Sequence, residues 1–221
     1  MTARNRLFPA AVIVAGAAML VAGCKTKGEL VVDEGVGVTA VRGACPAVGV
    51  PDYTGDITLF RTPGSTAATN VDVVASLTKV RAQCNDQAGD KVTATASFEV
   101  QARRTDTRGA RSVALPYFVT VLRGGTAVVA KRTGMVTVTF ADGQERASVT
   151  GQGNAFIDRA EATLPEDVRE RITRKRKAGD ADAAIDPLSD PQVRAAVNRA
   201  NFEVLVGFQL DDKQLAFNVT R

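Results

Sequence analysis

The chain has 221 residues, with 28 Lys and Arg against 24 Asp and Glu, and it contains no His. This charge balance is too even to indicate nucleic-acid binding, and two Tyr with no Trp leave few aromatic side chains to stack on bases or sugars. The absence of His excludes Ser-His-Asp and Cys-His catalysis as well as histidine-bound zinc.

The N-terminal segment has the organisation of a bacterial export signal. Arg4 and Arg6 precede an apolar run from Phe8 to Val21, and small residues follow it. The alternative is a transmembrane anchor that stays uncut, but the run is shorter than the ~20 apolar residues that span a bilayer. We therefore interpret residues 1–23 as a signal peptide.

The stretch Val21-Ala22-Gly23-Cys24 resembles the lipobox of bacterial lipoproteins. The resemblance implies that the Cys24 sulfur carries a diacylglycerol, that cleavage precedes Cys24, and that the new amino group is acylated, for example with palmitate. Lys25 stands where Asp would retain an enteric lipoprotein in the inner membrane. This favours attachment to the outer membrane, facing the periplasm; the periplasmic face of the inner membrane is the alternative.

The two remaining cysteines, Cys45 and Cys84, are expected to form a disulfide in an oxidising periplasm. The alternative is two separate buried thiols. Two Cys without His do not supply the four N or S ligands that structural zinc takes, so no metal and no cofactor are expected.

Residues 24–50 are rich in Gly and Val and predict a lipidated tether that leads into a first strand or irregular segment. Strands are predicted from Gly55 to Arg61 and from Val71 to Cys84, with a bulge where the alternation slips between Val73 and Val74. The clearest strand follows, because its apolar residues alternate on one face: Val92, Ala94, Ala96, Phe98, Val100 and Ala102.

Three further strands are predicted in the middle of the chain. Residues 113–121 include Pro116, which cannot donate to a strand ladder and therefore indicates an edge strand or a bulge. Residues 127–140 form one long strand or two strands kinked at Gly134. Asp142-Gly143 predicts a hairpin between this segment and residues 145–157.

The last quarter of the chain predicts helices and a final strand. A helix is expected from Glu166 to Lys177, acidic at its start and basic at its end. An acidic linker leads to Asp190-Pro191, which begins a second helix that ends near Arg199. Period-two alternation then returns over residues 202–210.

These elements predict a mainly β domain over residues 51–221, an antiparallel β-sandwich with a two-helix insertion at about 163–199, before the last strand. The arrangement is analogous to immunoglobulin-like and fibronectin-type domains, an analogy that implies no activity. A closed β-barrel with external helices is the alternative fold.

The basic end of the first helix is the main candidate surface, with these cations: Arg171, Arg174, Lys175, Arg176 and Lys177. We expect the narrow stripe of Leu164, Val168 and Ile172 to dock on the sandwich, so that the cations project and contact lipid head groups or another anionic surface. The alternative is a solvated helix end whose charges are balanced by Asp180 and Asp182.

Two smaller groups of charged residues carry weaker hypotheses. Arg103, Arg104, Arg108 and Arg111 are expected to form a second basic cluster at a loop tip. The acidic pairs Asp52/Asp56 and Asp211/Asp212 are interpreted as turn residues rather than as catalytic carboxylates.

At the level of the whole chain, the sequence resembles uncharacterised outer-membrane lipoproteins of alphaproteobacteria, a group without an assigned activity. We expect a non-enzymatic envelope lipoprotein that acts by protein contact or in a structural role at the periplasmic face of a membrane. Its expected partners are the membrane, through the N-terminal lipid, and an unidentified envelope protein, but no nucleic acid. The alternative is a carrier or sensor of an apolar or anionic envelope ligand, which requires an apolar pocket between the sheets.

Overall fold

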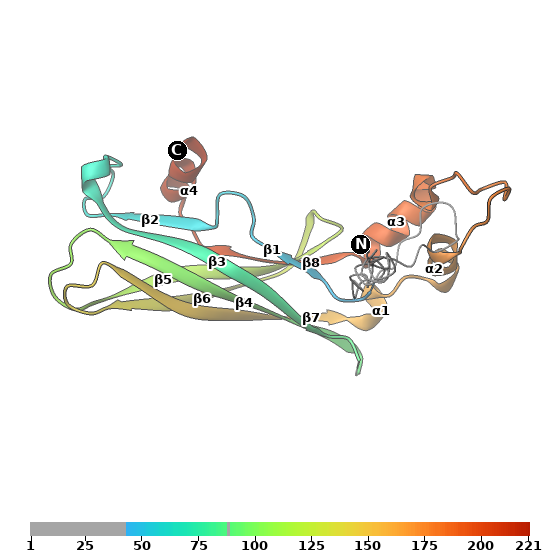
Figure 1. Cartoon of the computed structure of the whole chain (residues 1–221), viewed down its shortest axis with the longest axis horizontal. Helices are drawn as coiled ribbons and strands as arrows, with labels where there is room; N and C mark the ends of the chain where they lie inside the picture. Colours follow the sequence, from blue (N-terminus) through green and yellow to red (C-terminus); the bar gives the residue numbers. More distant parts are fainter. Residues whose placement is uncertain (1–42, 88) are drawn as a thin grey trace, which may run out of the picture. The chain divides into compact units, whose positions relative to one another are not determined.

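The computed structural model describes residues 43–87 and 89–221, in which eight strands form two four-stranded sheets (Figure 1). The β5 sheet has the order β1-β8-β5-β6, and the β4 sheet has the order β2-β3-β4-β7. The strands are β1 (Ala47–Gly49), β2 (Asp56–Phe60), β3 (Val71–Asn85), β4 (Lys91–Arg104), β5 (Arg111–Arg123), β6 (Ala127–Phe140), β7 (Arg146–Asp158) and β8 (Phe202–Phe208).

The predicted mainly β, antiparallel sandwich is confirmed. Every strand pair of the described residues is antiparallel except β1 with β8. The two sheets enclose one hydrophobic core, to which β4 contributes its whole predicted stripe from Val92 to Ala102. Alternation identified this strand because one of its faces is buried and the other is partly solvated.

The interior of the sandwich is filled by side chains that reach across from one sheet to the other. Gly153 of β7 lies so close to Val119 of β5 that a Cβ atom would overlap the valine side chain. Within the β4 sheet, Gly151 lies under the ring of Phe98 in the same way. Because glycines make room for these larger neighbours, the inner faces pack without a cavity between these residues.

The predicted disulfide between Cys45 and Cys84 is confirmed, with the two Cα atoms 5.9 Å apart. Cys45 precedes β1 and Cys84 lies in β3, so the bond joins segments of different sheets. β1 itself pairs with β8 through Val48 and Val204. β1 is thus a short first strand within residues 24–50, where the sequence allowed for a first strand or an irregular segment.

The strand irregularities differ from the expectations in part. β3 has a register shift against β2 at Val71 and Val73, next to the predicted slip, and a second one against β4 between Thr78 and Arg81, where Lys79 adopts a positive φ of 51°. β5, which contains Pro116, lies inside its sheet rather than at an edge, and its register shift lies between Val121 and Leu122, away from the proline. The proline is tolerated because its nitrogen points beyond the end of β8. In an antiparallel strand the N and C=O of one residue point to the same side, and the Pro116 carbonyl accepts from the N–H of Gln209, which follows the last residue of β8.

The Asp142-Gly143 turn exists, but it does not join a hairpin. β6 pairs with β5 and β7 pairs with β4, so the turn carries the chain from one sheet to the other. The segment between β4 and β5 makes the opposite crossing beside it. Turn chemistry favours a tight reversal of the chain, but it does not decide which strands pair.

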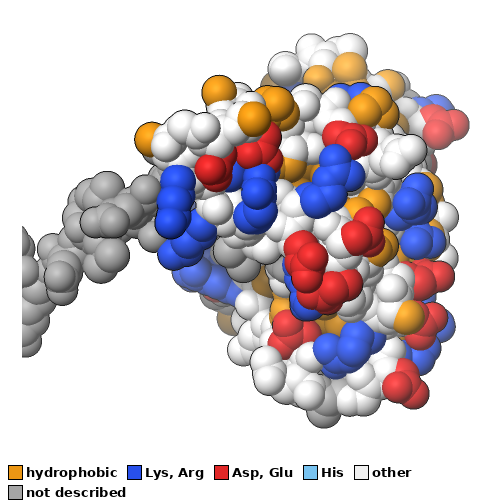
Figure 2. All heavy atoms as spheres, turned by 90° about the vertical axis from the view of Figure 1, so that its right-hand side faces the viewer, with side chains coloured by type: hydrophobic (Ala, Val, Ile, Leu, Met, Phe, Trp, Pro, Cys, Tyr) orange, Lys and Arg blue, Asp and Glu red, His pale blue; other side chains and the backbone are white. Residues whose placement is uncertain are grey.

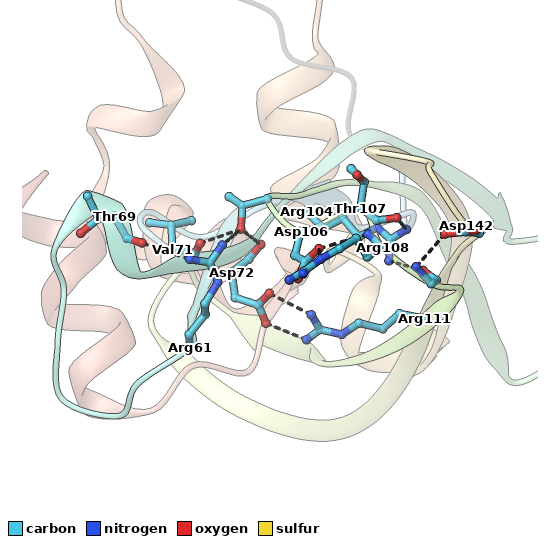
Figure 3. A network of polar contacts seen from close by, with 12 residues as sticks. Arg61, Thr69, Val71, Asp72, Arg104, Asp106, Thr107, Arg108, Arg111 and Asp142 are labelled. Carbon is cyan, nitrogen blue, oxygen red and sulfur yellow. Dashed lines mark hydrogen bonds and ion pairs between the residues drawn. The ribbon is translucent and has the colours of Figure 1, made fainter.

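The Arg104 side chain connects these two crossings and is almost completely buried, with 1% of its surface exposed. Its guanidinium donates to the carbonyls of Thr107 and Gly109 in one loop and of Ala141 and Gln144 in the other, at 2.7–2.8 Å. The same group lies over the ring of Phe140, 5.2 Å from its centroid. Figure 3 shows Arg104 among the polar residues of this end of the sandwich.

The helices between β7 and β8 are α1 (Arg159–Ala162), α2 (Glu166–Thr173) and α3 (Pro191–Ala200), with the short 3-10 turn η2 (Pro187–Ser189) just before α3. A second 3-10 turn, η1 (Ala68–Asn70), precedes β3. α3 begins as predicted, because the Asp190 carboxylate accepts from the backbone N–H groups of Gln192 and Val193. α2 ends at Thr173, so the prediction that this helix continues to Lys177 is wrong.

A further helix, α4 (Asp212–Thr220), follows β8 and was not predicted. Asp211 and Gln214 form a capping box at its start. The Asn218 side chain donates to the carbonyls of Tyr53 and Asp56, and Phe217 packs edge-on against Phe60. α4 therefore covers the outer edge of the β4 sheet at β2 (Figure 1).

We predict that Arg104→Lys lowers the free energy of unfolding by about 3 kcal/mol, because one ammonium cannot replace the guanidinium at four buried carbonyls in two loops. Urea unfolding followed by circular dichroism measures the change. Arg103→Lys is the matched control. Because the Arg103 side chain is exposed, this substitution should lower the free energy of unfolding by less than about 0.5 kcal/mol. Equal losses for the two variants would contradict the role assigned to Arg104.

Candidate functional site

The helical end of the domain, which carries the predicted basic surface, has a small hydrophobic core of its own. The core consists of Val168 and Ile172 from α2 and Val193, Ala196 and Val197 from α3. The predicted apolar stripe of α2 therefore packs against α3 and not on the sandwich, which corrects the expected docking mode. α3 in turn is fastened to β5, because Arg123 donates to the carbonyl of Arg199.

The predicted basic cluster does not project as a group of free cations. Arg171 forms an ion pair with Asp190 at 2.6 Å, and Arg174 pairs with Asp182. Arg176 is buried, with 4% of its surface exposed, and donates to the carbonyl of Arg171. The acidic linker folds back on these arginines because α2 ends early and the chain reverses direction.

The electrostatics of this end follow from the same ion pairs. The hydrogen bond from Arg174 lowers the pKa of Asp182, and that from Arg171 lowers the pKa of Asp190, so both carboxylates are ionised near neutral pH. Figure 2 shows Lys and Arg side chains lying beside Asp and Glu side chains over this face, rather than a patch of one sign. Lys175 and Lys177 are exposed at this face.

A hollow of about 920 Å3 lies at the helical end, but its lining does not favour one class of ligand. Three arginines of the basic cluster and three aspartates line it together: Arg171, Arg174, Arg176, Asp182, Asp186 and Asp190. Equal numbers of both charges produce no strong field of one sign in the hollow.

The second predicted cluster is also divided among separate partners. Arg103 lies near Glu145, Arg108 pairs with Asp106, and Arg111 forms two hydrogen bonds with Asp72 at 2.8 and 2.6 Å. Figure 3 shows Arg111 directed at Asp72 beside Asp106 and Arg108. The Arg108 hydrogen bonds lower the pKa of Asp106, and the Arg111 hydrogen bond lowers that of Asp72. Together with buried Arg104, these contacts stabilise loops rather than form a binding surface.

One acidic residue of each tight pair has a structural partner. The Asp56 carboxylate accepts from Ser76 and forms an ion pair with Arg221, and Asp211 caps α4. No group of three or more Cys, Asp or Glu suited to a metal ion occurs in the part of the chain that the structure describes. Among the same residues, no helix is long and apolar enough to cross a membrane. Cys24 lies outside the described residues.

The sequence did not single out the first half of β6, which the structure leaves exposed. Residues 127–133 are exposed without interruption, so both faces of the strand meet solvent, whereas the second half alternates between buried and exposed. Val128 and Val129 expose 63% and 51% of their surface. We call residues 127–133 the open edge of β6.

The open edge results from the way the two sheets cross. Near the 141–145 crossing, β6 and β7 lie close together, and Val136 and Val138 of β6 are buried. Farther along, Gly153 of β7 lies against Val119 of β5, so β7 covers β5 there and leaves the preceding part of β6 uncovered. The signal in the sequence is weak, because Val128-Val129 followed by Lys131-Arg132 is compatible with any strand.

Comparison with protein-family models, with curated proteins and with solved structures found no match to this chain.

We predict that the Asp72–Arg111 pair makes stability depend on acid. Asp72 has a lowered pKa in the folded chain, whereas its ordinary value is 3.8. The pair's contribution is therefore present above pH about 3.8 and is lost as the pH falls below it. Asp72→Asn should cost about 1 kcal/mol at pH 6 and progressively less in more acidic solution.

Denaturant unfolding between pH 2.5 and 7 measures this difference, in the range of about 1 kcal/mol expected for one partly exposed pair. Asp167→Asn is the control, because Asp167 is exposed and the described contacts give its side chain no ion pair. A loss on Asp72→Asn that stays constant with pH would contradict the assignment.

Proposed function

We propose that the chain is a non-enzymatic envelope lipoprotein, attached to the outer membrane through Cys24, whose β-sandwich acts by protein contact in the periplasm. The observation that carries this proposal is the filled interior, where Gly151 and Gly153 accommodate Phe98 and Val119. A carrier or sensor of an apolar ligand requires space between the sheets, so the filled interior favours a function at the surface instead.

The Cys45–Cys84 disulfide supports an extracytoplasmic location. Both cysteines are exposed, and exposed disulfides persist in oxidising compartments such as the periplasm. Asp56, Asp72, Asp106, Asp182, Asp190 and Asp211 are used in ion pairs, caps and loop contacts, which supports a role other than catalysis.

The position of β1 indicates which end of the domain is nearest the membrane in this proposal. Ala47 of β1 pairs with Glu203, near the start of β8, and β8 directly follows α3. The described chain therefore begins beside the helical end. We infer that this end faces the membrane and that Lys175 and Lys177 add a weak contact with anionic head groups to the lipid anchor.

Liposome flotation tests the electrostatic contact. The protein used lacks residues 1–23 and carries Cys24→Ser, so that it has no lipid. More of this protein should float with phosphatidylglycerol vesicles than with phosphatidylcholine vesicles, and the amount should fall as the salt concentration rises. Lys175→Gln with Lys177→Gln should reduce the difference, and the control Arg103→Gln with Arg146→Gln, paired on the β4 sheet at the end away from α2 and α3, should not. Equal recovery on both kinds of vesicle would mean that the basic cluster forms ion pairs within the chain and makes no contact with the membrane.

The lipid anchor is tested by mass spectrometry of the membrane-extracted chain. We expect a mature protein that begins at Cys24 and carries a diacylglycerol and an amide-linked fatty acid. Cys24→Ser should leave an uncleaved precursor without lipid. A wild-type chain that is uncut and unacylated would rule out the lipoprotein assignment.

A further inference from the structure

We propose that the open edge of β6, residues 127–133, binds an extended acidic segment of a partner protein, which adds a fifth strand to the β5 sheet. This inference rests on the proposed function, because it names the surface and the partner chemistry of the protein contact. It is independent of lipidation, which concerns Cys24 alone.

The backbone of the open edge is available for strand addition. β6 pairs with β5 on one side, and no other strand of the described residues pairs with its second side. An edge strand presents N–H and C=O groups in the sheet plane, and an extended peptide can satisfy them as a further strand. The added strand would continue the order β1-β8-β5-β6.

Two of the other three sheet edges are less accessible than this one. β1 has three residues, and β2 is covered by α4 through Asn218 and Phe217. The edge of β7 is also unpaired, but Gly151 and Gly153 weaken this strand as a template for pairing. The open edge of β6 is neither short nor covered, and its cations together with the register shift opposite Val121 and Leu122 restrict pairing to a complementary segment.

The side chains of the open edge define what an added strand must carry. Lys131 and Arg132 are consecutive, so one cation lies on each face of the strand. The Lys131 ammonium lies over the ring of Phe118, 4.8 Å from its centroid, and Arg132 pairs across the ladder with Val119 of the inner face. No Asp or Glu occurs between residues 124 and 141 to balance these charges.

Charge complementarity therefore favours an acidic partner over a second copy of this chain. A second β6 would bring two more cations to the same edge, and like charges on neighbouring strands destabilise a sheet. A strand with a carboxylate opposite Lys131 and another opposite Arg132 places an opposite charge on both faces. Its remaining residues would cover Val128 and Val129, which are apolar and exposed.

The test uses the full chain in detergent and two synthetic seven-residue peptides. Both consist of Thr and Val with two central charged residues, which are Glu in one peptide and Lys in the other. Backbone hydrogen exchange of residues 127–133 reports strand addition directly. We expect the acidic peptide to slow this exchange and to bind at least roughly tenfold more tightly than the basic one.

Charge exchange supplies the decisive variants. Lys131→Glu with Arg132→Glu should reverse the preference, so that the basic peptide now protects residues 127–133. The matched control, Arg103→Glu with Arg146→Glu on the β4 sheet, should leave the preference for the acidic peptide unchanged. Reversal distinguishes a specific edge from a general attraction to a cationic protein.

Three results would overturn the inference. In the first, neither peptide protects the edge; in the second, both peptides protect it equally; in the third, sedimentation shows a dimer whose edge is already protected. The last result would assign the edge to a second copy of this chain. None of them changes the mass of lipidated Cys24, so a failure here is distinguishable from a failure of the proposed membrane attachment.

Discussion

The structure depends on one buried cation, the guanidinium of Arg104, which donates to four carbonyls and forms no ion pair with a carboxylate of the described residues. Burying a charge is costly unless hydrogen bonds replace its hydration, and four carbonyls supply them here. Two of these carbonyls belong to the β4–β5 crossing and two to the β6–β7 crossing. The side chain therefore fixes both places where the chain changes sheets at this end of the sandwich.

This constraint determines how the strands next to it are exposed. β6 and β7 leave the crossing together, but β7 passes over β5 by the time it reaches Gly153. The twist of two packed sheets produces such a divergence. As a result, the second half of β6 is core and the first half is the open edge. At the other end, the Cys45–Cys84 bond and the helices join the sheets by different means.

The sequence predicted the features that local patterns determine. The alternation of β4, the start of α3 at Asp190 and the cysteine pair were correct because burial of one face, a side-chain cap and an oxidised pair each leave a direct signal. The capping box of Asp211 and Gln214 is a comparable signal for α4, but Asp211 and Asp212 were interpreted only as turn residues.

The features that were missed depend on residues distant in the chain. Pro116 is tolerated because β8 ends beside it, and the Asp142-Gly143 turn joins two sheets because β5 and β4 take the neighbouring positions. Arg104 was grouped with exposed arginines, since only the fold brings four carbonyls to it. The cations after α2 were expected to project, but their distribution depends on how the acidic linker folds back.

Hydrogen exchange of the full chain without a partner tests the central role of the Arg104 crossing most directly. The Gly143 N–H donates to the Thr107 carbonyl at 2.9 Å, and the Gly109 N–H donates to the Asp142 carboxylate at 2.6 Å. Both amides join one crossing to the other, so they should exchange slowly although they lie in loops. Exchange as fast as that of Gly125 in the β5–β6 turn would contradict the conclusion that Arg104 holds the two crossings together.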